Sequence, residues 1–451
     1  MLRVILTALT MTRAGNGLPV KSPTEVGMSS SRLGAIERVV ERGIKAGGYP
    51  GASVIVGRKG AAVFEKGFGK LSWSENSTPV DAQRTIYDVA SLSKVVGTTT
   101  AIMILYDEKK IGLDDPVVNY IPTFGGGDKD KVTVRQLLTH TSGLPAGRDI
   151  WRIAQTPLEA RALVLSTPLE GSPGAQYIYS DLGADVLGLL VEVVSGEPLD
   201  KFLTRRVFEP LGMNETMYRP ADSLRYRIAP TEVTPPRGYP LRGEVHDENA
   251  YALGGVAGHA GLFSTAADLS VFAQMMLNGG EYNGVQIISK PTVELFTSRA
   301  FGHRALGWDT AEGDYGSGRY LGPTAYGHTG FTGTSMWIDP EREMFVILLT
   351  NRVHAARALR PAKVIADVRA DLSDAAVLSV LDGPKLASGS KAFRADREVG
   401  WNPPPRASRR RHGSSRHHSI ASATSRSRAS SAKKSASGKK ASATKSSKKS
   451  R

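Results

Sequence analysis

Two regions of strand-forming residues lie near opposite ends of the chain, and this placement limits the possible folds more than any other feature. Near the start, residues 51–56 and 61–68 are rich in small and β-branched residues and enclose an Arg-Lys-Gly turn. Near the end, residues 334–338 and 344–349 enclose an Asp-Pro-Glu-Arg turn. Short turns join strands that pair antiparallel. We therefore expect one antiparallel sheet built from both ends of the folded body.

The chain between these regions is predicted to be mostly helical. Residues 94–106 are apolar on nearly every side, which is typical of a buried helix. A helix over 29–47 is also expected before the first strands, because Leu33, Ile36 and Val40 recur at helical spacing. The fold class that follows is α+β: an antiparallel sheet flanked by helices, with an inserted, mostly helical subdomain. Further helices are expected at 133–138, 182–195, 199–208, 266–277 and 360–371.

The net positive charge is confined to the C-terminal end. The formal net charge of the 451 residues is +15, but residues 401–451 hold fifteen Lys or Arg and no Asp or Glu. The rest of the chain holds 43 basic and 43 acidic residues, so it is neutral. The changes in composition predict a lead-in over 1–24 with a weak signal-like segment, a folded body over 25–382, a linker over 383–405 and a disordered basic tail over 406–451.

The sequence leaves the location of the protein open. Without cysteine the chain has no disulfide framework, Cys nucleophile or thiolate metal site, and it suits oxidising and reducing compartments alike. Residues 1–11 combine one Arg with a short apolar run but are not followed by an A-x-A-like cleavage site, so a periplasmic or extracellular location is about as expected as a cytoplasmic one. No stretch reaches the roughly 18 apolar residues of a transmembrane helix.

Ser91 and Lys94 form an S-x-x-K sequence at the start of the predicted buried helix. Residues three apart share a helix face, so the amine of Lys94 can reach the hydroxyl of Ser91. A serine hydroxyl becomes a good nucleophile when a neighbouring base accepts its proton, and a lysine can be that base if burial lowers its pKa. The helix N-terminus also offers a backbone N–H to a developing oxyanion. Ser91 is therefore a candidate nucleophile, and Lys94 is its candidate proton acceptor.

The spacing alone is weak evidence. It recurs in the predicted linker and tail, for instance at Ser388 and Lys391, where no core could bury the lysine. In isolation, Ser91 is better explained as the N-cap of a helix. The case for chemistry depends on two further elements.

The first of these is Tyr179-Ser180-Asp181, the single Tyr-x-Asn/Asp triplet of the chain. A phenol that lies against the Ser/Lys pair can relay a proton to a leaving group. The structural alternative is a tyrosine at the edge of the core, followed by an aspartate that caps a helix.

The second is His328-Thr329-Gly330, followed by Phe331, at the start of a predicted strand. We expect Gly330 to let a ligand lie along the strand edge and the N–H of Phe331 to donate to an oxyanion. His328 and Thr329 can hydrogen-bond a carboxylate or a carbonyl. A glycine-rich turn that enters a strand is the structural alternative.

The order of the three elements resembles the S-x-x-K, Y-x-N and K-T-G signatures of penicillin-binding proteins and β-lactamases. With the supporting stretches 67–69, 138–144 and 258–268, the chain is similar to the β-lactamase-related serine hydrolase family over about residues 25–370. That family includes class C β-lactamases, D-alanyl-D-alanine carboxypeptidases and family VIII esterases. The resemblance implies a catalytic domain over 25–382 that works through an acyl-enzyme.

The resemblance also assigns roles to the candidate residues. Ser91, Lys94 and Tyr179 would be catalytic. The substrate-binding and oxyanion residues would be Asp181, His328, Thr329, Gly330 and Phe331. No cofactor is implied.

Two residues depart from the family's pattern. Asp181 stands where the family often has Asn, and His328 stands where β-lactamases have Lys. A neutral imidazole offers a penicillin carboxylate only a hydrogen bond. The departures favour an esterase, amidase or peptidase over an efficient β-lactamase, with a small-molecule ester, an amide or a peptidoglycan-derived substrate. Residues 245–256 are similar to a subgroup with muropeptide-acting amidases and penicillin-binding-protein-4B-like hydrolases.

Other sites have less support. His246, Asp247, Glu248 and His259 could be metal ligands, but adjacent ligands on one loop rarely converge on one ion, and neither H-E-x-x-H nor H-x-x-E-H is present, so we expect no metal. His140 is expected to be a structural hydrogen-bonding residue. The rival to an enzyme is a non-catalytic penicillin-binding-like module that the basic tail tethers to polyanions.

The tail gives a testable prediction. Deletion of residues 406–451 should leave ester hydrolysis unchanged and abolish retention on heparin resin, because these residues carry the excess charge. Initial rates with p-nitrophenyl butyrate and the salt concentration of elution measure the two effects. Loss of activity on truncation would contradict a division into body and tail, and unchanged elution would indicate a solvated extension with no polyanion partner.

Overall fold

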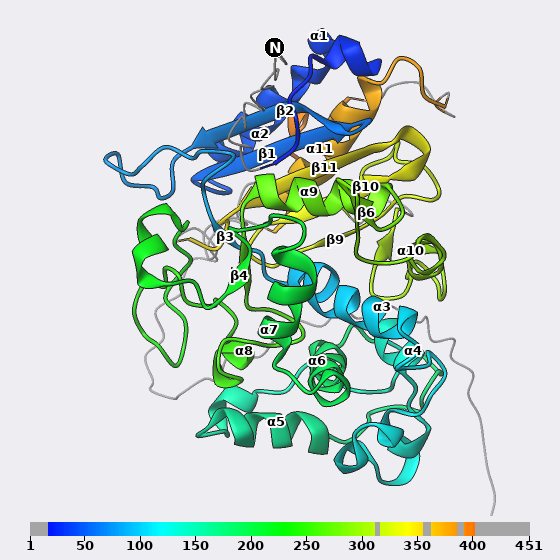
Figure 1. Cartoon of the computed structure of the whole chain (residues 1–451). Helices are drawn as coiled ribbons and strands as arrows, with labels where there is room; N and C mark the ends of the chain where they lie inside the picture. The colour runs from blue at the N-terminus through cyan, green and yellow to red at the C-terminus, as the bar shows by residue number, and fades with distance from the viewer. Residues whose placement is uncertain (1–16, 312–315, 355–361, 385, 387–391, 402–451) are drawn as a thin grey trace, which may run out of the picture. The chain divides into compact units, whose positions relative to one another are not determined.

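The computed structural model describes residues 17–311, 316–354, 362–384, 386 and 392–401. Among these residues, six strands form one antiparallel sheet in the order β2-β1-β11-β10-β9-β8 (Figure 1). The expected sheet from both ends of the body is thereby confirmed. Its strands are β1 (Gly51–Arg58), β2 (Ala61–Gly69), β8 (Asp309–Thr310), β9 (Tyr326–Thr329), β10 (Ser335–Asp339) and β11 (Met344–Thr350).

The two regions of the chain meet where β1 pairs with β11. The register runs from Ala52 opposite Thr350 to Arg58 opposite Met344. Every residue of both strands is buried, which explains why they read as continuous apolar runs instead of alternating with polar residues. This central pair fixes the position of every strand on either side of it.

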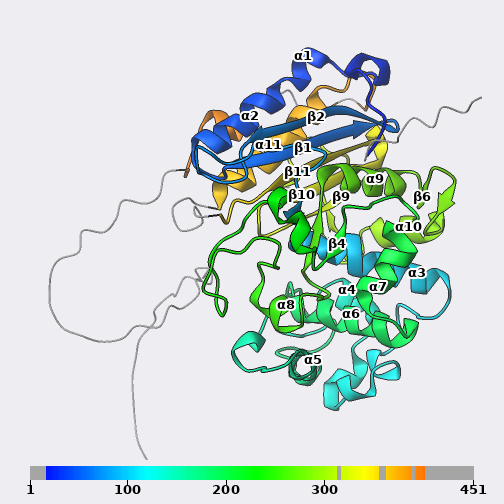
Figure 2. The same ribbon diagram turned by 60° about the vertical axis from the view of Figure 1, so that its left-hand side comes forward.

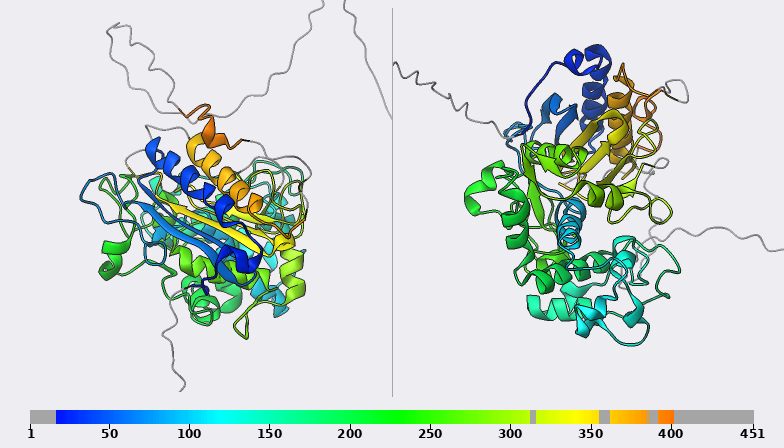
Figure 3. Two further views of the ribbon diagram at one scale, coloured as in Figure 1. Left: turned by 90° about the horizontal axis from the view of Figure 1, so that it is seen from above. Right: turned by 45° about the vertical axis from the view of Figure 1, so that its right-hand side comes forward.

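One face of the sheet is covered by α2 (Ala35–Lys45) and α11 (Lys363–Leu378), which lie side by side (Figure 3). Their apolar residues form one core with Val54 of β1 and Leu348 of β11. The apolar residues whose helical spacing predicted the first helix are therefore those that pack against this face of the sheet.

The opposite face meets α9 (Ala266–Leu277), which packs on β1 and β11. Ile55 and Ile347 point to this side and belong to a second core. That core continues into the helical part of the chain, so the sheet and the inserted helices are held by one apolar cluster.

The other helices of the helical part surround α6 (Asp181–Ser195) (Figure 2). Most residues of the first three turns of α6 are buried. This helix packs against α3 (Thr100–Asp107), α4 (Val134–Leu138), α5 (Pro157–Ser166) and α7 (Leu199–Leu203). No helix among the described residues has the length and apolar character needed to cross a membrane. The other α-helices of the described residues are α1 (Ser30–Leu33), α8 (Glu248–Ala252) and α10 (Lys290–Thr297). The other strands form a small sheet of β3 (Tyr87–Asp88), β5 (Leu262–Ser264) and β4 (Met217–Tyr218), and the pair β6 (Glu281–Tyr282) and β7 (Val285–Gln286).

Two predicted boundaries differ from the structure. In the lead-in, Leu18 is buried and Val20 bridges to Ala62 of β2, so this part of the lead-in lies against the sheet edge. In the predicted linker, residues 392–401 also pack on the body, where Trp401 is buried and its Nε1 donates to Asp367 of α11 at 2.8 Å. Composition did not predict this packing because only a few residues of the segment, such as Ala395 and Trp401, are buried in an otherwise polar stretch. The signal-like segment and the basic tail lie outside the described residues.

Because β11 is buried on both faces, we predict that loss of a side chain on either face destabilises the fold. Ile347→Ala and Leu348→Ala should each lower the free energy of unfolding by about 2–5 kcal/mol, through lost burial and the cavity left behind. Leu381→Ala is the control, since this leucine is 60% exposed and should change stability by less than about 0.5 kcal/mol. Urea titration followed by circular dichroism gives all three values. A negligible loss for one face would mean that its helical layer is not tightly packed.

Candidate active site

Ser91 lies at the junction between β3 and a buried helix. Asp88 of β3 accepts a hydrogen bond from the backbone N–H of Ala90 at 2.9 Å. Ala90 has a φ of 49°, in the left-handed region that residues with a side chain rarely adopt. A π-helical turn then begins at Lys94 and continues into α3. Strained backbone of this kind is concentrated at functional sites.

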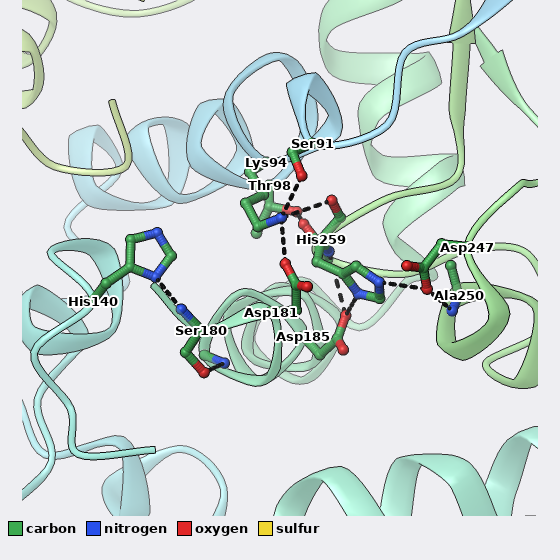
Figure 4. Close-up of polar contacts among 12 residues, drawn as sticks. Ser91, Lys94, Thr98, His140, Ser180, Asp181, Asp185, Asp247, Ala250 and His259 are labelled. Atoms are coloured by element: carbon green, nitrogen blue, oxygen red, sulfur yellow. Dashed lines mark hydrogen bonds and ion pairs between the residues drawn. The ribbon is translucent and has the colours of Figure 1, made fainter. Parts of the chain in front are cut away.

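The ammonium group of Lys94 is buried and surrounded by oxygen atoms. Its side chain is 3% exposed, and Nζ lies 2.7 Å from Oδ1 of Asp181. Nζ also donates to Ser91 Oγ at 3.0 Å and to the main-chain oxygen of His259 at 3.2 Å (Figure 4). Of the three N–H groups of the ammonium, two make hydrogen bonds to Ser91 and His259, and Asp181 lies within ion-pair distance. Lys94 therefore acts toward Ser91 as a hydrogen-bond donor.

The charge of Lys94 depends on its neighbours as well as on its burial. Burial alone lowers the pKa of Lys94, but the Asp181 carboxylate and the Tyr179 phenol together raise it by more. The pKa of Lys94 consequently lies above its ordinary value, and the side chain is a cation at neutral pH. The condition under which Lys94 could be a base, a pKa lowered by burial, is opposed by the partner charge of Asp181.

Tyr179 joins the cluster from the segment before α6. Its ring centroid lies 4.9 Å from Lys94 Nζ, 4.6 Å from the ring centroid of His140 and 6.0 Å from that of His328. The guanidinium carbon of Arg304 lies 5.9 Å from the same ring. The structure thus brings the three sequence elements together around one tyrosine.

Ser180 leaves the carboxylate of Asp181 available for Lys94. The Ser180 hydroxyl accepts a hydrogen bond from the N–H of Gly183 at 3.1 Å, so the N-cap of α6 is the serine and not the aspartate. The N–H of Ser180 donates to Nδ1 of His140 at 3.0 Å. His140 therefore makes a structural hydrogen bond, as expected, and it orients the start of α6.

The turn after β9 is fastened to the segment before Ser91. Thr332 Oγ1 donates to the carbonyl of Asp88 at 2.8 Å, and Thr334 Oγ1 donates to that of Val89 at 2.9 Å. A Cβ at Gly330 would lie 2.5 Å from the carbonyl oxygen of Val89 and would also clash with Thr334. The observed reason for a glycine is therefore close packing between protein segments, where the sequence had suggested room for a ligand.

His328 is buried and neutral. Burial lowers its pKa to about 4, with the nearby cations Arg304 and Lys94 acting in the same direction and Asp309 opposing them. Its Nδ1 lies 2.8 Å from the main-chain oxygen of Thr329. The missing β-lactamase lysine is thus replaced by an uncharged ring. Thr329 is half-buried and Phe331 is 48% exposed.

The histidines considered as metal ligands bind carboxylates instead. His246 Nε2 lies 2.8 Å from Glu232, and His259 lies between Asp185 and Asp247. Within the described part of the chain, no group of three or more His, Cys, Asp or Glu side chains could hold a metal ion. Sequence reasoning missed Asp185, although a second aspartate four residues after Asp181 in an apolar helix was a usable signal.

A pocket of about 580 Å³ lies beside this cluster in the fold without including it. Its lining includes Trp151, Arg242, Tyr251 and Phe263. Phe263 belongs to β5 and pairs with Asp88 of β3. None of Ser91, Lys94 or Tyr179 lines the pocket, so the chemistry is assigned from the cluster and not from the cavity.

A family profile and a curated relative both match most of this chain. A family profile described as "Beta-lactamase" matches residues 36–370. A protein of Escherichia coli K12 named "Putative D-alanyl-D-alanine carboxypeptidase" is 33% identical over 397 residues, which cover 79% of this chain and 91% of that protein.

Solved structures show the same fold. An octameric penicillin-binding protein homologue from Pyrococcus abyssi has a TM-score of 0.58 and 26% identity, and the match covers 71% of this chain and 73% of the other. A class C β-lactamase has a TM-score of 0.63 with 18% identity, over 79% of this chain and 98% of the other. At that identity, the second likeness concerns the fold alone.

The lowered pKa of His328 predicts acid sensitivity. An imidazole titrates near 6.5 in the unfolded chain and at about 4 in the fold, so the unfolded state binds the extra proton between these values. The free energy of unfolding should therefore fall as the pH drops from 6.5 to 4, with a His328 contribution of about 3 kcal/mol. Urea titrations across this range should show a shallower pH dependence for His328→Asn. Equal slopes for the two proteins would contradict a buried neutral imidazole.

Proposed function

The chain belongs to the β-lactamase family of serine hydrolases, and we propose that it hydrolyses ester or amide bonds through an acyl-enzyme on Ser91. The observation that carries the proposal is the contact of 3.0 Å between Lys94 Nζ and Ser91 Oγ, at a strained turn and beside Tyr179. A serine held by a buried cation next to a phenol is equipped for nucleophilic attack.

In acylation, Ser91 Oγ forms a bond to the substrate carbonyl carbon. The Ser91 proton passes to the phenol oxygen of Tyr179, while the phenol proton passes to the departing oxygen or nitrogen. The bond to the leaving group then breaks, which leaves the acyl group on Ser91. Lys94 remains a cation throughout and stabilises negative charge that develops on Oγ. In deacylation, water attacks the acyl carbon, and the same relay runs in reverse to restore Ser91.

The oxyanion would be bound by the backbone N–H groups of Ser91 and Phe331. Support comes from the hydrogen bonds of Thr332 and Thr334, which hold the turn after β9 against the residues before Ser91. Arg369 of α11 adds to this by donating to the carbonyls of Gly330 and Thr334 at 2.6 and 2.8 Å. Two donors on segments fastened to each other are preorganised for an oxyanion.

For the substrate, we propose a peptidoglycan-derived amide or a small ester over a β-lactam. The carboxylate of a penicillin would meet the neutral ring of His328, since the cation of Arg304 is already paired with Asp309 in the fold. The carboxypeptidase name of the relative favours a peptide substrate. A panel of short esters, nitrocefin and peptides ending in D-Ala-D-Ala tests this, with kcat/KM for esters or peptides expected to exceed that for nitrocefin by about tenfold or more.

The nucleophile is tested by covalent labelling. Wild-type protein should gain one fluorophosphonate adduct by intact mass, and Ser91→Ala should gain none. Ser298→Ala serves as the control. Ser298 is exposed at the C-terminal end of α10, so its substitution should not affect labelling. Absence of both an adduct and p-nitrophenyl butyrate turnover in the wild type would support the rival, a non-catalytic penicillin-binding-like module.

The relay is tested at Tyr179. Tyr179→Phe keeps the ring that packs on His140 but removes the phenol oxygen, so kcat should fall by about 10²- to 10⁴-fold with the melting temperature little changed. Rates with esters that have increasingly good leaving groups should recover part of the loss, because such groups need less protonation. Wild-type turnover in Tyr179→Phe would exclude the phenol from the relay.

A further inference from the structure

We propose that His259, held between Asp185 and Asp247, is a positioning residue that keeps Lys94 directed at Ser91. The three residues are named here the Asp185–His259–Asp247 clamp. The inference rests on the proposed function, since it assigns His259 a role through Lys94. It adds an element that lies outside the S-x-x-K, Tyr179 and β9 elements of the site.

The clamp is formed by two short contacts in a buried position. Nδ1 of His259 lies 2.7 Å from Oδ1 of Asp185, and Nε2 lies 2.9 Å from Oδ1 of Asp247 (Figure 4). The side chains of His259 and Asp185 are 2% and 3% exposed, and that of Asp247 is 35% exposed. Both ring nitrogens thus face carboxylate oxygens.

The contacts require a doubly protonated ring. Ionised carboxylates only accept hydrogen bonds, so each ring nitrogen facing one must carry a proton. Burial alone lowers the pKa of His259, but the charges of Asp185 and Asp247 raise it well above its ordinary value. The pKa of Asp247 is correspondingly held below its usual range, against the effect of burial, by the His259 charge. The imidazolium cannot accept a proton from Ser91, which excludes it as the catalytic base.

The main chain of His259 connects the clamp to Lys94. Its carbonyl oxygen accepts from Lys94 Nζ at 3.2 Å, and its N–H lies 3.3 Å from Asp185 Oδ1. Asp185 lies one helical turn after Asp181, the carboxylate paired with Lys94. The clamp therefore holds the His259 carbonyl, which accepts from the Lys94 ammonium. Its Asp185 also lies on α6, the helix that carries Asp181, the ion-pair partner of Lys94.

Neighbouring contacts fasten the same segment to the helix that carries Ser91 and Lys94. Thr98 Oγ1 donates to the carbonyl of Gly258 at 2.7 Å, and the N–H of Leu262 donates to Ser93 Oγ at 3.1 Å. A Cβ at Gly258 would clash with the carbonyl of Ala184 in α6. With segment 258–262 pressed between the two helices, a shift of His259 would move the acceptor of Lys94.

Loss of the imidazolium should therefore reduce turnover more than binding. His259→Gln leaves the carboxylates of Asp185 and Asp247 without a shared cation, so that they repel each other and release segment 258–262. We expect kcat per fluorophosphonate-reactive site to fall by about 10²-fold and KM to change by less than about threefold, because the oxyanion and substrate contacts remain. Adding Asp247→Asn to His259→Gln should restore at least about tenfold, since an amide pair removes the repulsion.

The pH profile distinguishes positioning from a structural role. Lys94 and its partner Asp181 are the nearest titratable groups outside the clamp, while Asp88 interacts with Asp247 and Tyr218 with Asp185. Because the pKa of His259 is raised, the clamp is intact below that pKa and is lost as the pH rises through it. Asp247→Asn removes one stabilising charge, so the alkaline limb of kcat should move to lower pH. If His259→Gln does not fold, the pH profile of Asp247→Asn still tests the positioning role of His259.

The control is Asp200→Asn, which breaks an ion pair away from the site, the contact of 2.6 Å between Asp200 and the exposed Arg219. It should lower the melting temperature without changing kcat per reactive site or the alkaline limb. The protonation state is read directly by ¹⁵N NMR of labelled histidine, where both ring nitrogens of His259 should be protonated at pH 8.

Two results would overturn the clamp. One is a neutral imidazole at pH 7, and the other is wild-type kcat per reactive site in both His259→Gln and Asp247→Asn. If the wild-type protein itself takes no fluorophosphonate, the proposed function fails instead, and the NMR measurement still decides whether the clamp exists.

Discussion

The buried ammonium of Lys94 is the interaction on which the site depends. A cation removed from water is costly unless it is hydrogen-bonded and paired, and here Ser91 and His259 accept hydrogen bonds from the ammonium while Asp181 supplies the opposite charge. These three residues come from the start of the catalytic helix, from α6 and from the segment before β5. Satisfying a single charge therefore holds three distant parts of the chain at one point.

The other charges of the site follow a consistent arrangement. His328 and His140 are buried without a paired carboxylate that could outweigh desolvation, and their pKa values fall. His259 is equally buried but lies between two carboxylates, and its pKa rises. Three histidines in one site thus differ in charge because of their partners and not because of their exposure. Around Tyr179 this leaves neutral rings with two cations, a setting suited to a negative charge that develops during acyl transfer.

The chain shares its fold with its family but differs from the family's pattern at positions 181 and 328. The fold and the order of its elements are those of the β-lactamase family of serine hydrolases. Within that fold, a carboxylate at position 181 keeps Lys94 charged, and an imidazole at position 328 leaves no lysine for a β-lactam carboxylate.

Local patterns in the sequence determined the strands, the buried helix behind Ser91, the family and the residues that meet at Tyr179. Strand and helix periodicity reflect contacts with near neighbours and with a core, which a sequence records. Charge states and partners were decided only by the tertiary structure. The ion pair of Lys94 with Asp181, the position of His259 between two carboxylates and the packing that demands Gly330 all join residues far apart in the chain. Such pairings depend on which side chains folding buries together, and in a buried site the partner, more than the residue type, sets the charge.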